Sequence, residues 1–470
     1  MSTETTNDVW RDDLLDRKRH AEYLKLFLID RSKKRAENNG GAYVLNIDAN
    51  WGVGKSFFIE RFSRQLSFDG HIVVNVNAWK DDHANEPFIA VLAAIDRVIK
   101  PLLKKEPRLA GLWRKTKSTA GPLLLKTASG VGRAALKKYA DSELNQLLEE
   151  PLGDVGKSAI EGGKQVVETE IEKLVSGATE KLLTDFNKQS DSIELFRNNL
   201  GLAIQKLASE KKLPLFVFID ELDRCRPSYA ISLLERVKHL FDATNIVFVF
   251  ATNTDQLQHA ISGAYGPSFN GYRYLKRFFE RTYSLPQPDP TNFAKALAKE
   301  IDFSKTRSPD NNNIDFLIRS CKNYDFDLRE IQQLFDLLES SLSAWQNTTK
   351  IDLVALIPLI AQFIKENKAD WQGAYKLIPE NFNIDIGHVN RAGISTLLNV
   401  SKTFNELRAA SKDLQRAVQI HQNEDRNDPN MSYAANSFVD EWENTNARGA
   451  SLQFRLPTIV TSAGNFLQRK

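Results

Sequence analysis

The stretch that decides the fold, residues 43–56, reads Tyr-Val-Leu-Asn-Ile-Asp-Ala-Asn-Trp-Gly-Val-Gly-Lys-Ser. Its first five residues are mostly apolar and predict a buried strand, and its last two open a segment with the apolar spacing of a helix. Strand, glycine loop, Lys-Ser and helix follow one another in the order of a phosphate-binding loop. Small residues let backbone N–H groups surround phosphate oxygens, and the helix N-terminus adds its positive end.

This loop predicts nucleotide contacts residue by residue. Lys55 is expected to reach the β- and γ-phosphates and to act in catalysis, and the Ser56 hydroxyl is expected to ligate Mg²⁺. Ala49 stands where the consensus has its first glycine, so the loop taken alone also fits an ordinary turn into a helix. The candidate nucleotide-binding residues of the loop are Asn50, Trp51, Gly52, Val53, Gly54, Lys55, Ser56 and Phe57.

A second half of the site lies far downstream, where residues 213–224 read Leu-Pro-Leu-Phe-Val-Phe-Ile-Asp-Glu-Leu-Asp-Arg. An apolar strand that ends in Asp-Glu is a Walker B pattern. Asp220 is expected to hold Mg²⁺ through water, and Glu221 to polarise the attacking water. A core strand followed by an acidic turn is the plainer alternative. Two half-motifs in the right order, each on a strand, predict a P-loop NTPase that uses ATP and Mg²⁺.

Polar residues also follow two other predicted strands. Residues 71–79 form a strand whose end carries Asn77 and Trp79, and residues 246–253 form a buried strand that ends at Asn253. Ligands of open α/β sheets gather at the carboxyl ends of strands. Asn77 and Trp79 are therefore expected at the rim of the site. Asn253 is a candidate catalytic residue that senses the γ-phosphate or positions the lytic water, with Asp255 as the alternative. Residues 13–17, before the first strand, either lie along the base of the site or belong to a plain amphipathic helix.

Length and composition limit the class of protein. A chain of 470 residues is expected to form two or three domains, and 42% hydrophobic with 26% charged residues is typical of a soluble globular protein. The net charge of +3 gives no global affinity for polyanions. The two cysteines cannot form a disulfide framework and fit a reducing cytoplasm. The polar N-terminus lacks a signal peptide, and no apolar stretch is long enough to span a membrane, so we expect a cytoplasmic protein.

Residues 101–190 differ in character from the rest. Basic residues dominate residues 101–140, where Glu106 is the one acid, and acidic clusters dominate residues 141–190. We interpret the segment as an insertion of amphipathic helices between the two halves of the NTPase. Its basic half, with Trp113, suits contact with an anionic surface, either lipid headgroups or nucleic acid. The alternative is a helical subdomain whose basic half pairs with its acidic half.

Two arginines further along are candidates for the site. Arg277 lies in the run Tyr274–Arg277 and is a candidate catalytic finger that acts in trans on a neighbour's nucleotide; a solvated charge is the alternative. Arg329 begins an amphipathic helix and is a candidate for folding back onto the nucleotide. Prolines at 286, 288 and 290 mark a boundary between these two arginines, and from about residue 291 the apolar spacing is helical.

Taken together, these motifs resemble those of the KAP family of P-loop NTPases over roughly residues 10–340. The resemblance implies a relation to STAND and AAA+ ATPases and to bacterial phage-exclusion proteins. Many members carry transmembrane helices between Walker A and Walker B, whereas residues 101–190 of this chain are too charged to span a membrane. The resembling segments are Trp51–Ser56, Asn77–Trp79, Ile219–Cys225, Tyr274–Arg277 and Asp327–Ile331.

The sequence therefore predicts an α/β fold: a P-loop core with a mainly parallel sheet, a helical insertion and an α-helical C-terminal region. The expected function is a KAP-type ATPase that acts as a conformational switch or oligomeric motor in bacterial anti-phage defence, as a homo-oligomer or with a partner effector protein. The alternatives are a nucleotide-gated scaffold attached peripherally to the inner membrane face and a DNA-associated ATPase. The expected domains are 1–100 and 191–290 for the two halves of the core, 101–190 for the insertion, 291–350 for a helical lid and 351–470 for the C-terminal region.

Overall fold

The computed structural model divides the chain into two compact units, Met1–Pro286 and Gln287–Lys470. Most of the expected insertion, residues 126–190, lies outside the residues that the structure describes. The described residues are 9–38, 40–83, 87–104, 107–125, 194–208, 211–237, 243–309, 311–389, 395–422, 428–445 and 449–467.

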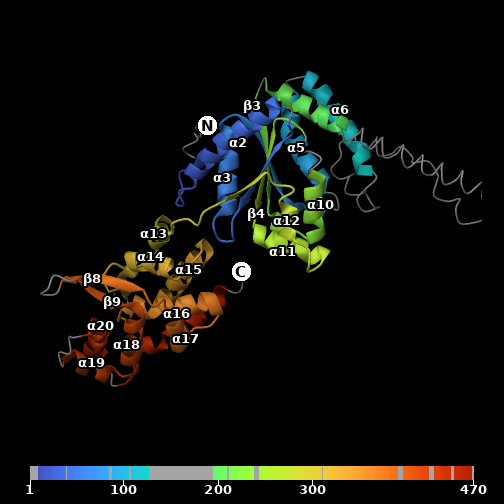
Figure 1. Ribbon diagram of the computed structural model, residues 1–470. Coiled ribbons are helices and arrows are strands. Elements are labelled where there is room, and N and C mark those ends of the chain that lie inside the picture. Colours follow the sequence, from blue (N-terminus) through green and yellow to red (C-terminus); the bar gives the residue numbers. More distant parts are fainter. Residues whose placement is uncertain are drawn as a thin grey trace, which may run out of the picture. The chain divides into compact units, whose positions relative to one another are not determined.

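A five-stranded sheet forms the centre of the first unit (Figure 1). Its strand order is β2-β3-β4-β1-β5, and every neighbouring pair is parallel. The mainly parallel sheet predicted from the sequence is thus confirmed. All carboxyl ends of the strands meet at one edge, and all amino ends meet at the opposite edge. The strands are β1 (Tyr43–Asp48), β2 (His71–Asn77), β3 (Lys212–Asp220), β4 (Ile246–Thr252) and β5 (Arg281–Ser284).

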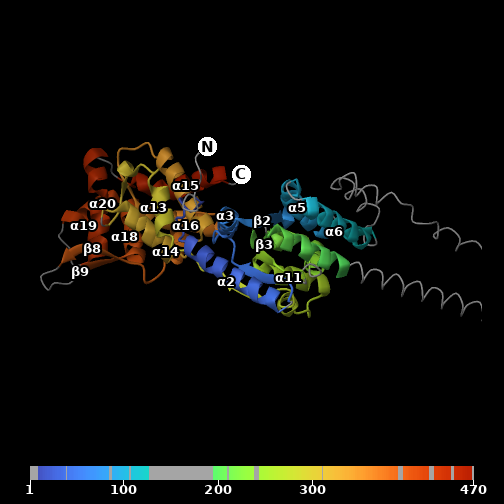
Figure 2. The ribbon, with the colours of Figure 1, turned by 90° about the horizontal axis from the view of Figure 1, so that it is seen from above.

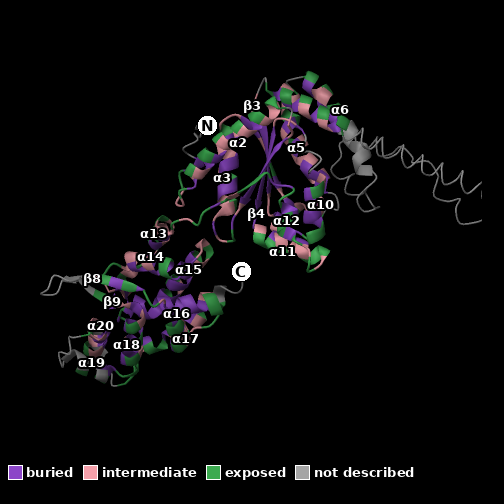
Figure 3. Ribbon diagram, in the orientation of Figure 1, coloured by how far each residue is buried: buried purple, intermediate pink, exposed green. Residues whose placement is uncertain are grey.

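The inner strands are buried on both faces, which explains their nearly continuous apolar sequences (Figure 3). Asn46 of β1 and Thr252 of β4 are exceptions, since both are polar and fully buried. The amide of Asn46 donates to Thr254 Oγ1 at 2.9 Å and its carbonyl oxygen accepts from Thr252 Oγ1 at 2.9 Å. These bonds satisfy the buried amide and tie β1 to the end of β4, beside the loop that carries the lysine.

Helices cover both faces of this sheet, as Figures 1 and 2 show. One face packs against α2 and α3 through residues such as Leu24, Phe58 and Phe62. The other packs against α5, α10 and the helical residues 194–207 in a second apolar cluster. The helices of this unit are α2 (Lys18–Glu37), α3 (Lys55–Phe68), α4 (Ala78–Asp81), α5 (Pro87–Leu103), α6 (Pro107–Leu125), η1 (Leu222–Arg224), α10 (Pro227–Val237), α11 (Thr254–Tyr265) and α12 (Gly271–Leu275).

The described start of the expected insertion packs onto this core. Trp113 of α6 is only 1% exposed, and its indole N–H donates to Asp96 Oδ1 of α5 at 2.6 Å. The expectation that Trp113 accompanies the basic residues at an anionic surface is therefore wrong, because its ring is part of the core. Within the described part of the chain, no helix combines the length and apolar character needed to cross a membrane.

The second unit is mainly helical and is built around α16 (Leu353–Glu366), whose residues 353–363 are all buried. An antiparallel pair, β8 (Asn383–Val389) with β9 (Ser395–Asn399), lies in the region expected to be helical. Burial alternates from Phe382 to Asp385, which is the period of a strand. The other elements are α13 (Thr291–Ala298), η3 (Phe303–Lys305), β6 (Thr306–Arg307), α14 (Asn313–Asn323), α15 (Leu328–Ala344), β7 (Ile351–Asp352), α17 (Trp371–Leu377), α18 (Val400–Lys412), α19 (Leu414–Gln422), α20 (Pro429–Thr445), η4 (Leu452–Arg455) and α21 (Leu456–Leu467).

Candidate nucleotide-binding site

The loop between β1 and α3 has the backbone that its glycines allow. Gly52 and Gly54 have φ angles of 79° and 82°, in the left-handed region that favours glycine. Ala49 is not in that region, which explains why alanine is tolerated where the consensus has its first glycine. Gly54 directly precedes α3, so the free N–H groups of the first helical turn lie next to the loop. This arrangement suits phosphate oxygens.

Lys55 is the first residue of α3, and its charge is buried. Its side chain is 10% exposed and its Nζ lies 3.8 Å from Asp223 Oδ1, on a side chain that is 2% exposed. Neither atom finds a hydrogen-bond partner among the described residues. Burial lowers the pKa of Lys55, and the charges of Asp223, Asp220 and Asp48 oppose that shift. A buried ammonium group with unused N–H donors is poorly stabilised by the protein alone, so its chemistry fits a phosphate ligand.

The end of β3 supplies the acidic side of the site. Asp220 Oδ1 accepts from the backbone N–H of Glu221 at 2.8 Å, and burial raises the pKa of this carboxyl. Glu221 has a φ angle of 61°, an uncommon value for a residue with a side chain. This sharp change of direction after the strand places the two neighbouring carboxylates in different surroundings. Asp220 and the Ser56 hydroxyl are oxygen donors of the kind that Mg²⁺ prefers.

Both carboxylate oxygens of Glu221 are engaged by the protein. Asn77 Nδ2 donates to Oε2 at 2.6 Å, and Arg224 Nη1 lies 2.8 Å from Oε1. Asn77 reaches across from the end of β2, while its own Oδ1 caps α4 by accepting from Lys80 N at 2.9 Å. In this conformation the base predicted to activate water is therefore held by one hydrogen bond and one ion pair.

Further contacts join the segment after β2 to the turn after β3. The guanidinium of Arg224 lies 5.7 Å from the ring centre of Trp79. Asp82 accepts from the backbone N and the Nε of Arg226, each at 2.9 Å. Cys225 donates its thiol to the Glu221 carbonyl oxygen at 3.5 Å, and burial raises the pKa of that thiol to about 12. Two motifs that are far apart in the sequence thus form one wall beside Glu221.

Asn253 follows the last residue of β4 and caps α11. The residue is only 5% exposed, and its Oδ1 accepts from Gln256 N at 3.1 Å. The alternative, Asp255, is exposed on α11 and bonds Gln258 at 2.6 Å. The two neighbouring strand ends are joined because Asp48 Oδ1 accepts from Thr254 N at 2.8 Å. The catalytic role of Asn253 stays a prediction.

The other loop residues divide between exposed and anchored positions. Asn50 and Ser56 are exposed, and Phe57 is half-buried beside the ring of Trp10. Trp51 is 47% exposed, yet its indole N–H donates to Asp223 Oδ2 at 3.1 Å. This bond ties the tip of the loop to the acidic turn after β3.

One candidate arginine lies away from this loop, and the other belongs to the second unit. Arg277 is exposed and precedes β5, whose first residue Arg281 is the register partner of Leu45 near the start of β1. Arg277 thus lies toward the amino edge of the sheet, and the loop follows the carboxyl end of β1. Arg329 is exposed at the start of α15, in the second unit. The roles of both arginines at a nucleotide stay predictions.

Sequence reasoning gave too little weight to Arg17 and Asp223. Arg17 is 1% exposed and donates to the Val53 carbonyl oxygen at 2.6 Å and to that of Pro286 at 2.8 Å. It therefore links the glycine loop to Pro286, the residue at which the first unit ends. The sequence signal was the position of residues 13–17 before the first strand. For Asp223, the one sequence signal was its position in the Asp-Glu-Leu-Asp-Arg run, which does not reveal that it faces Lys55.

Comparison with known proteins agrees with this geometry. The chain is 24% identical over 317 residues to the phage T7 exclusion protein of Escherichia coli (strain K12), a match that covers 63% of this chain and 38% of that protein. The chain thus spans well under half the length of that relative. A solved structure of the Aeropyrum pernix ORC2 protein in ADPNP-ADP complexes is 12% identical, with coverage of 97% and 95% and a TM-score of 0.30, too low to support an argument. The model of the KAP family P-loop domain matches residues 32–343, more than half of the chain. This nucleotide-binding chain therefore belongs to the KAP family of P-loop NTPases.

Proposed function

We propose that this protein binds and hydrolyses Mg-ATP and uses the cycle as a conformational switch. The observation that carries the proposal is the buried ammonium group of Lys55, which lacks a hydrogen-bond partner at the N-terminus of α3. It faces the nearly buried Asp223 and lies within the electrostatic influence of Asp220. Burial of this ammonium group costs free energy, and a bound anion would offset that cost.

Each side chain then has a distinct role. Lys55 and the backbone N–H groups that follow Gly52 and Gly54 bind phosphate oxygens. Ser56 and Asp220 would hold Mg²⁺, which would supply positive charge to offset that of the phosphate groups. Glu221 orients a water molecule and accepts its proton. Asn253 senses the γ-phosphate in this scheme, and Arg329 folds back onto the nucleotide from the second unit.

The restraint on Glu221 favours a switch over continuous turnover. Asn77 and Arg224 contact both carboxylate oxygens and hold the side chain in place, so a movement of Glu221 toward an attacking water has to break at least one of these contacts. A signal that moves the segment after β2 would release it. Arg277 lies toward the opposite edge of the sheet and so serves as a finger only for a second copy, which makes a homo-oligomer part of the proposal.

Phosphate release by the purified full-length chain tests the chemistry. We expect release from ATP with Mg²⁺ and none with a chelator, and GTP as competing substrate measures the preference for ATP. Asp220→Asn should weaken Mg-nucleotide binding, whereas Asp30→Asn, on α2 with a side chain that is 51% exposed, serves as the matched control. The proposal is wrong if the chain neither binds ATP nor releases phosphate in the presence of Mg²⁺.

The biological part of the proposal is anti-phage defence, supported by the similarity to the phage T7 exclusion protein. Cells that express the chain should form fewer phage plaques than cells that express Lys55→Ala at the same level. Equal plaque numbers would contradict the defence role. Protection by Glu221→Gln would favour the alternative, a nucleotide-gated scaffold in which binding suffices.

Partners and location are also proposals. We infer a cytoplasmic protein in which residues 101–140 contact anionic lipid or nucleic acid, or that acts with an effector protein. Liposome flotation and gel-shift assays separate lipid from DNA. A contact of this kind should weaken as salt rises, since it is electrostatic. Retention in the membrane pellet after a high-salt wash would contradict a peripheral attachment.

A further inference from the structure

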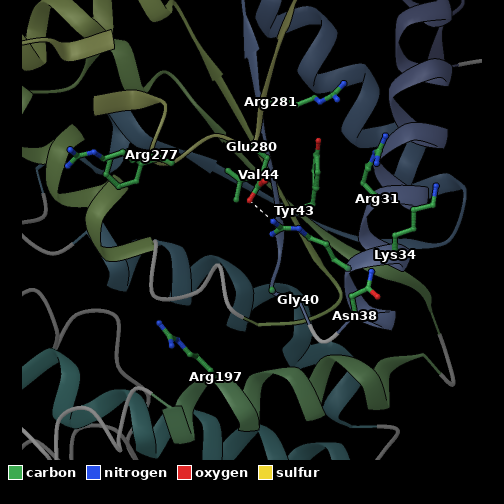
Figure 4. Close-up of a pocket in the computed structure, with 13 residues that line it drawn as sticks. Arg31, Lys34, Asn38, Gly40, Tyr43, Val44, Arg197, Arg277, Glu280 and Arg281 are labelled. Carbon is green, nitrogen blue, oxygen red and sulfur yellow. Dashed lines mark hydrogen bonds and ion pairs between the residues drawn. The ribbon is translucent and has the colours of Figure 1, made fainter. Parts of the chain in front are cut away.

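A hollow of about 880 Å³ lies at the amino edge of the sheet in the first unit, away from the glycine loop (Figure 4). Its volume is in the range of small-molecule binding sites. Three separate segments supply its charged walls: α2, the helical residues 194–207 and the chain that leads into β5. Glu280 is the one acid among its described lining residues. The basic lining residues are Arg31, Lys34, Arg35, Arg197, Arg277 and Arg281.

Three of these arginines surround a single tyrosine. Figure 4 shows Tyr43 with Arg31 and Arg281 near its hydroxyl end. Arg35 donates to Glu280 Oε1 at 2.7 Å and to the Ala42 carbonyl oxygen at 2.6 Å. Burial raises the pKa of Tyr43, and the positive charges of Arg281, Arg31 and Arg35 oppose that shift. One carboxylate, Glu280, offsets only one of these positive charges.

Aromatic rings hold the guanidinium groups in place. Arg31 and Arg281 lie 5.3 Å and 6.0 Å from the ring centre of Phe27, and Arg35 lies 5.9 Å from that of Tyr43. A guanidinium group that contacts a ring keeps N–H groups for other acceptors, and its planar fork matches phosphate oxygens. Neither Arg31 nor Arg281 forms an ion pair with a carboxylate of the described residues. Like charges held together in this way repel one another unless an anion lies between them.

We propose that this hollow is a second anion site, separate from the glycine loop, which binds closely spaced phosphate groups between Arg31, Arg35 and Arg281. Its volume exceeds that of one phosphate, and Arg197, on the wall formed by the helical residues 194–207, adds a further positive charge. Such groups occur in free polyphosphates and in the backbone of a single nucleic-acid strand. The shared chemistry is the phosphate, and the experiment separates the two sources.

The test measures binding of inorganic tripolyphosphate and of a short single-stranded oligonucleotide by calorimetry. Every protein carries Lys55→Ala, so that the glycine loop does not compete for the probes. In this background we compare Arg31→Gln, Arg281→Gln and their combination with Lys33→Gln. Lys33 lies on the same helix, has a side chain that is 76% exposed and is not a lining residue of the hollow. It therefore controls for the loss of one positive charge.

We expect at least one probe to bind, with affinity about tenfold weaker for each arginine removed and nearly unchanged in Lys33→Gln. Arg281→Lys should lose less affinity for the probe than Arg281→Gln. This order would show that the loss follows from the missing charge and not from misfolding. The probe that binds more tightly identifies the source of the phosphates. Absence of binding by both probes overturns the proposal, as does equal binding by the Gln variants and Lys33→Gln. A change in oligomeric state without loss of anion binding also overturns it, because the arginines would then serve contact between copies.

Discussion

The two edges of one sheet place their charges in opposite ways. At the carboxyl edge, Lys55 and Asp223 are almost completely buried, with side chains 10% and 2% exposed. At the amino edge, Arg277 and Arg281 are exposed, and six basic residues share a hollow with one acid. The first edge concentrates few charges of both signs, whereas the second collects many of one sign.

This difference decides how each edge recognises an anion. Electrostatic interactions are strong where water is excluded and depend little on salt. Exposed arginines attract anions over a longer range, but each contributes less and salt screens it. We therefore expect the largest effects of substitution at the carboxyl edge. The following predictions test that contrast in order of decreasing effect.

Lys55→Ala should lower ATP turnover by on the order of 10³-fold, because it removes a buried charge aimed at phosphate. Steady-state phosphate release measures this. Lys55→Met should be equally inactive, and the nucleotide-free protein should unfold at a lower temperature, because the buried Asp223 carboxylate loses its positive partner. Lys55→Met combined with Asp223→Asn should recover part of that stability without recovering turnover. Unchanged turnover in Lys55→Ala would refute the assignment of the site.

Glu221→Gln should keep nucleotide affinity and slow turnover by roughly 10²-fold, the scale of general-base catalysis. Binding is measured with a fluorescent nucleotide and turnover by phosphate release. Glu60→Gln, an exposed change on α3 whose side chain is 66% exposed, is the control. Normal turnover in Glu221→Gln would make Asp223 the next candidate for the base.

Arg17→Met should destabilise the first unit by about 2 kcal/mol, because the buried Val53 carbonyl group loses its donor, as does the carbonyl group of the exposed Pro286. Chemical denaturation measures the free energy of unfolding. Arg19→Gln is the control, since its ion pair with Asp16 joins side chains that are 69% and 64% exposed and should change stability by less than about 1 kcal/mol. Equal effects of the two substitutions would mean that Arg17 does not hold the loop.

Asn77→Ser should raise basal ATP turnover by about tenfold, because it removes one hydrogen bond that restrains Glu221. Serine keeps an oxygen that can cap α4, so the helix start should survive. Circular dichroism checks the fold, and phosphate release without any partner measures the effect. A fall in turnover would show instead that Asn77 positions the base for catalysis.

The affinity for Mg-nucleotide should fall with decreasing pH, by at most about tenfold per pH unit. Burial raises the pKa of Asp220 above its ordinary value of 3.8, so the carboxylate takes up a proton at a higher pH than an exposed aspartate and then loses its attraction for Mg²⁺. In the nucleotide-free protein, the stability of the fold changes with pH in the opposite direction. The folded state holds the proton more tightly, so stability falls as pH rises from about 3.8 through the raised pKa. Asp220→Asn should bind more weakly and lack this pH dependence.

Much of the core was predictable from local patterns. Short apolar runs bounded by glycine, acidic or asparagine residues located β1, β3 and β4, because an inner parallel strand buries both faces. The β8–β9 pair was not predicted, although burial alternates along β8. The alternation of apolar and polar residues in β8 covers only a few positions, and helices precede and follow the pair. The helical spacing of these neighbours therefore dominated the prediction.

The site divides in the same way. The sequence by itself determined the chemical groups and their order: the glycines that permit positive φ, the lysine at a helix start and the carboxylates at a strand end. These depend on backbone geometry within a few residues. Only the tertiary structure decided that Asp223 faces Lys55, that Asn77 holds Glu221, and that Arg17 supports the loop. Such contacts depend on how parallel strands far apart in the sequence come into register, and that register is fixed by packing of the whole sheet.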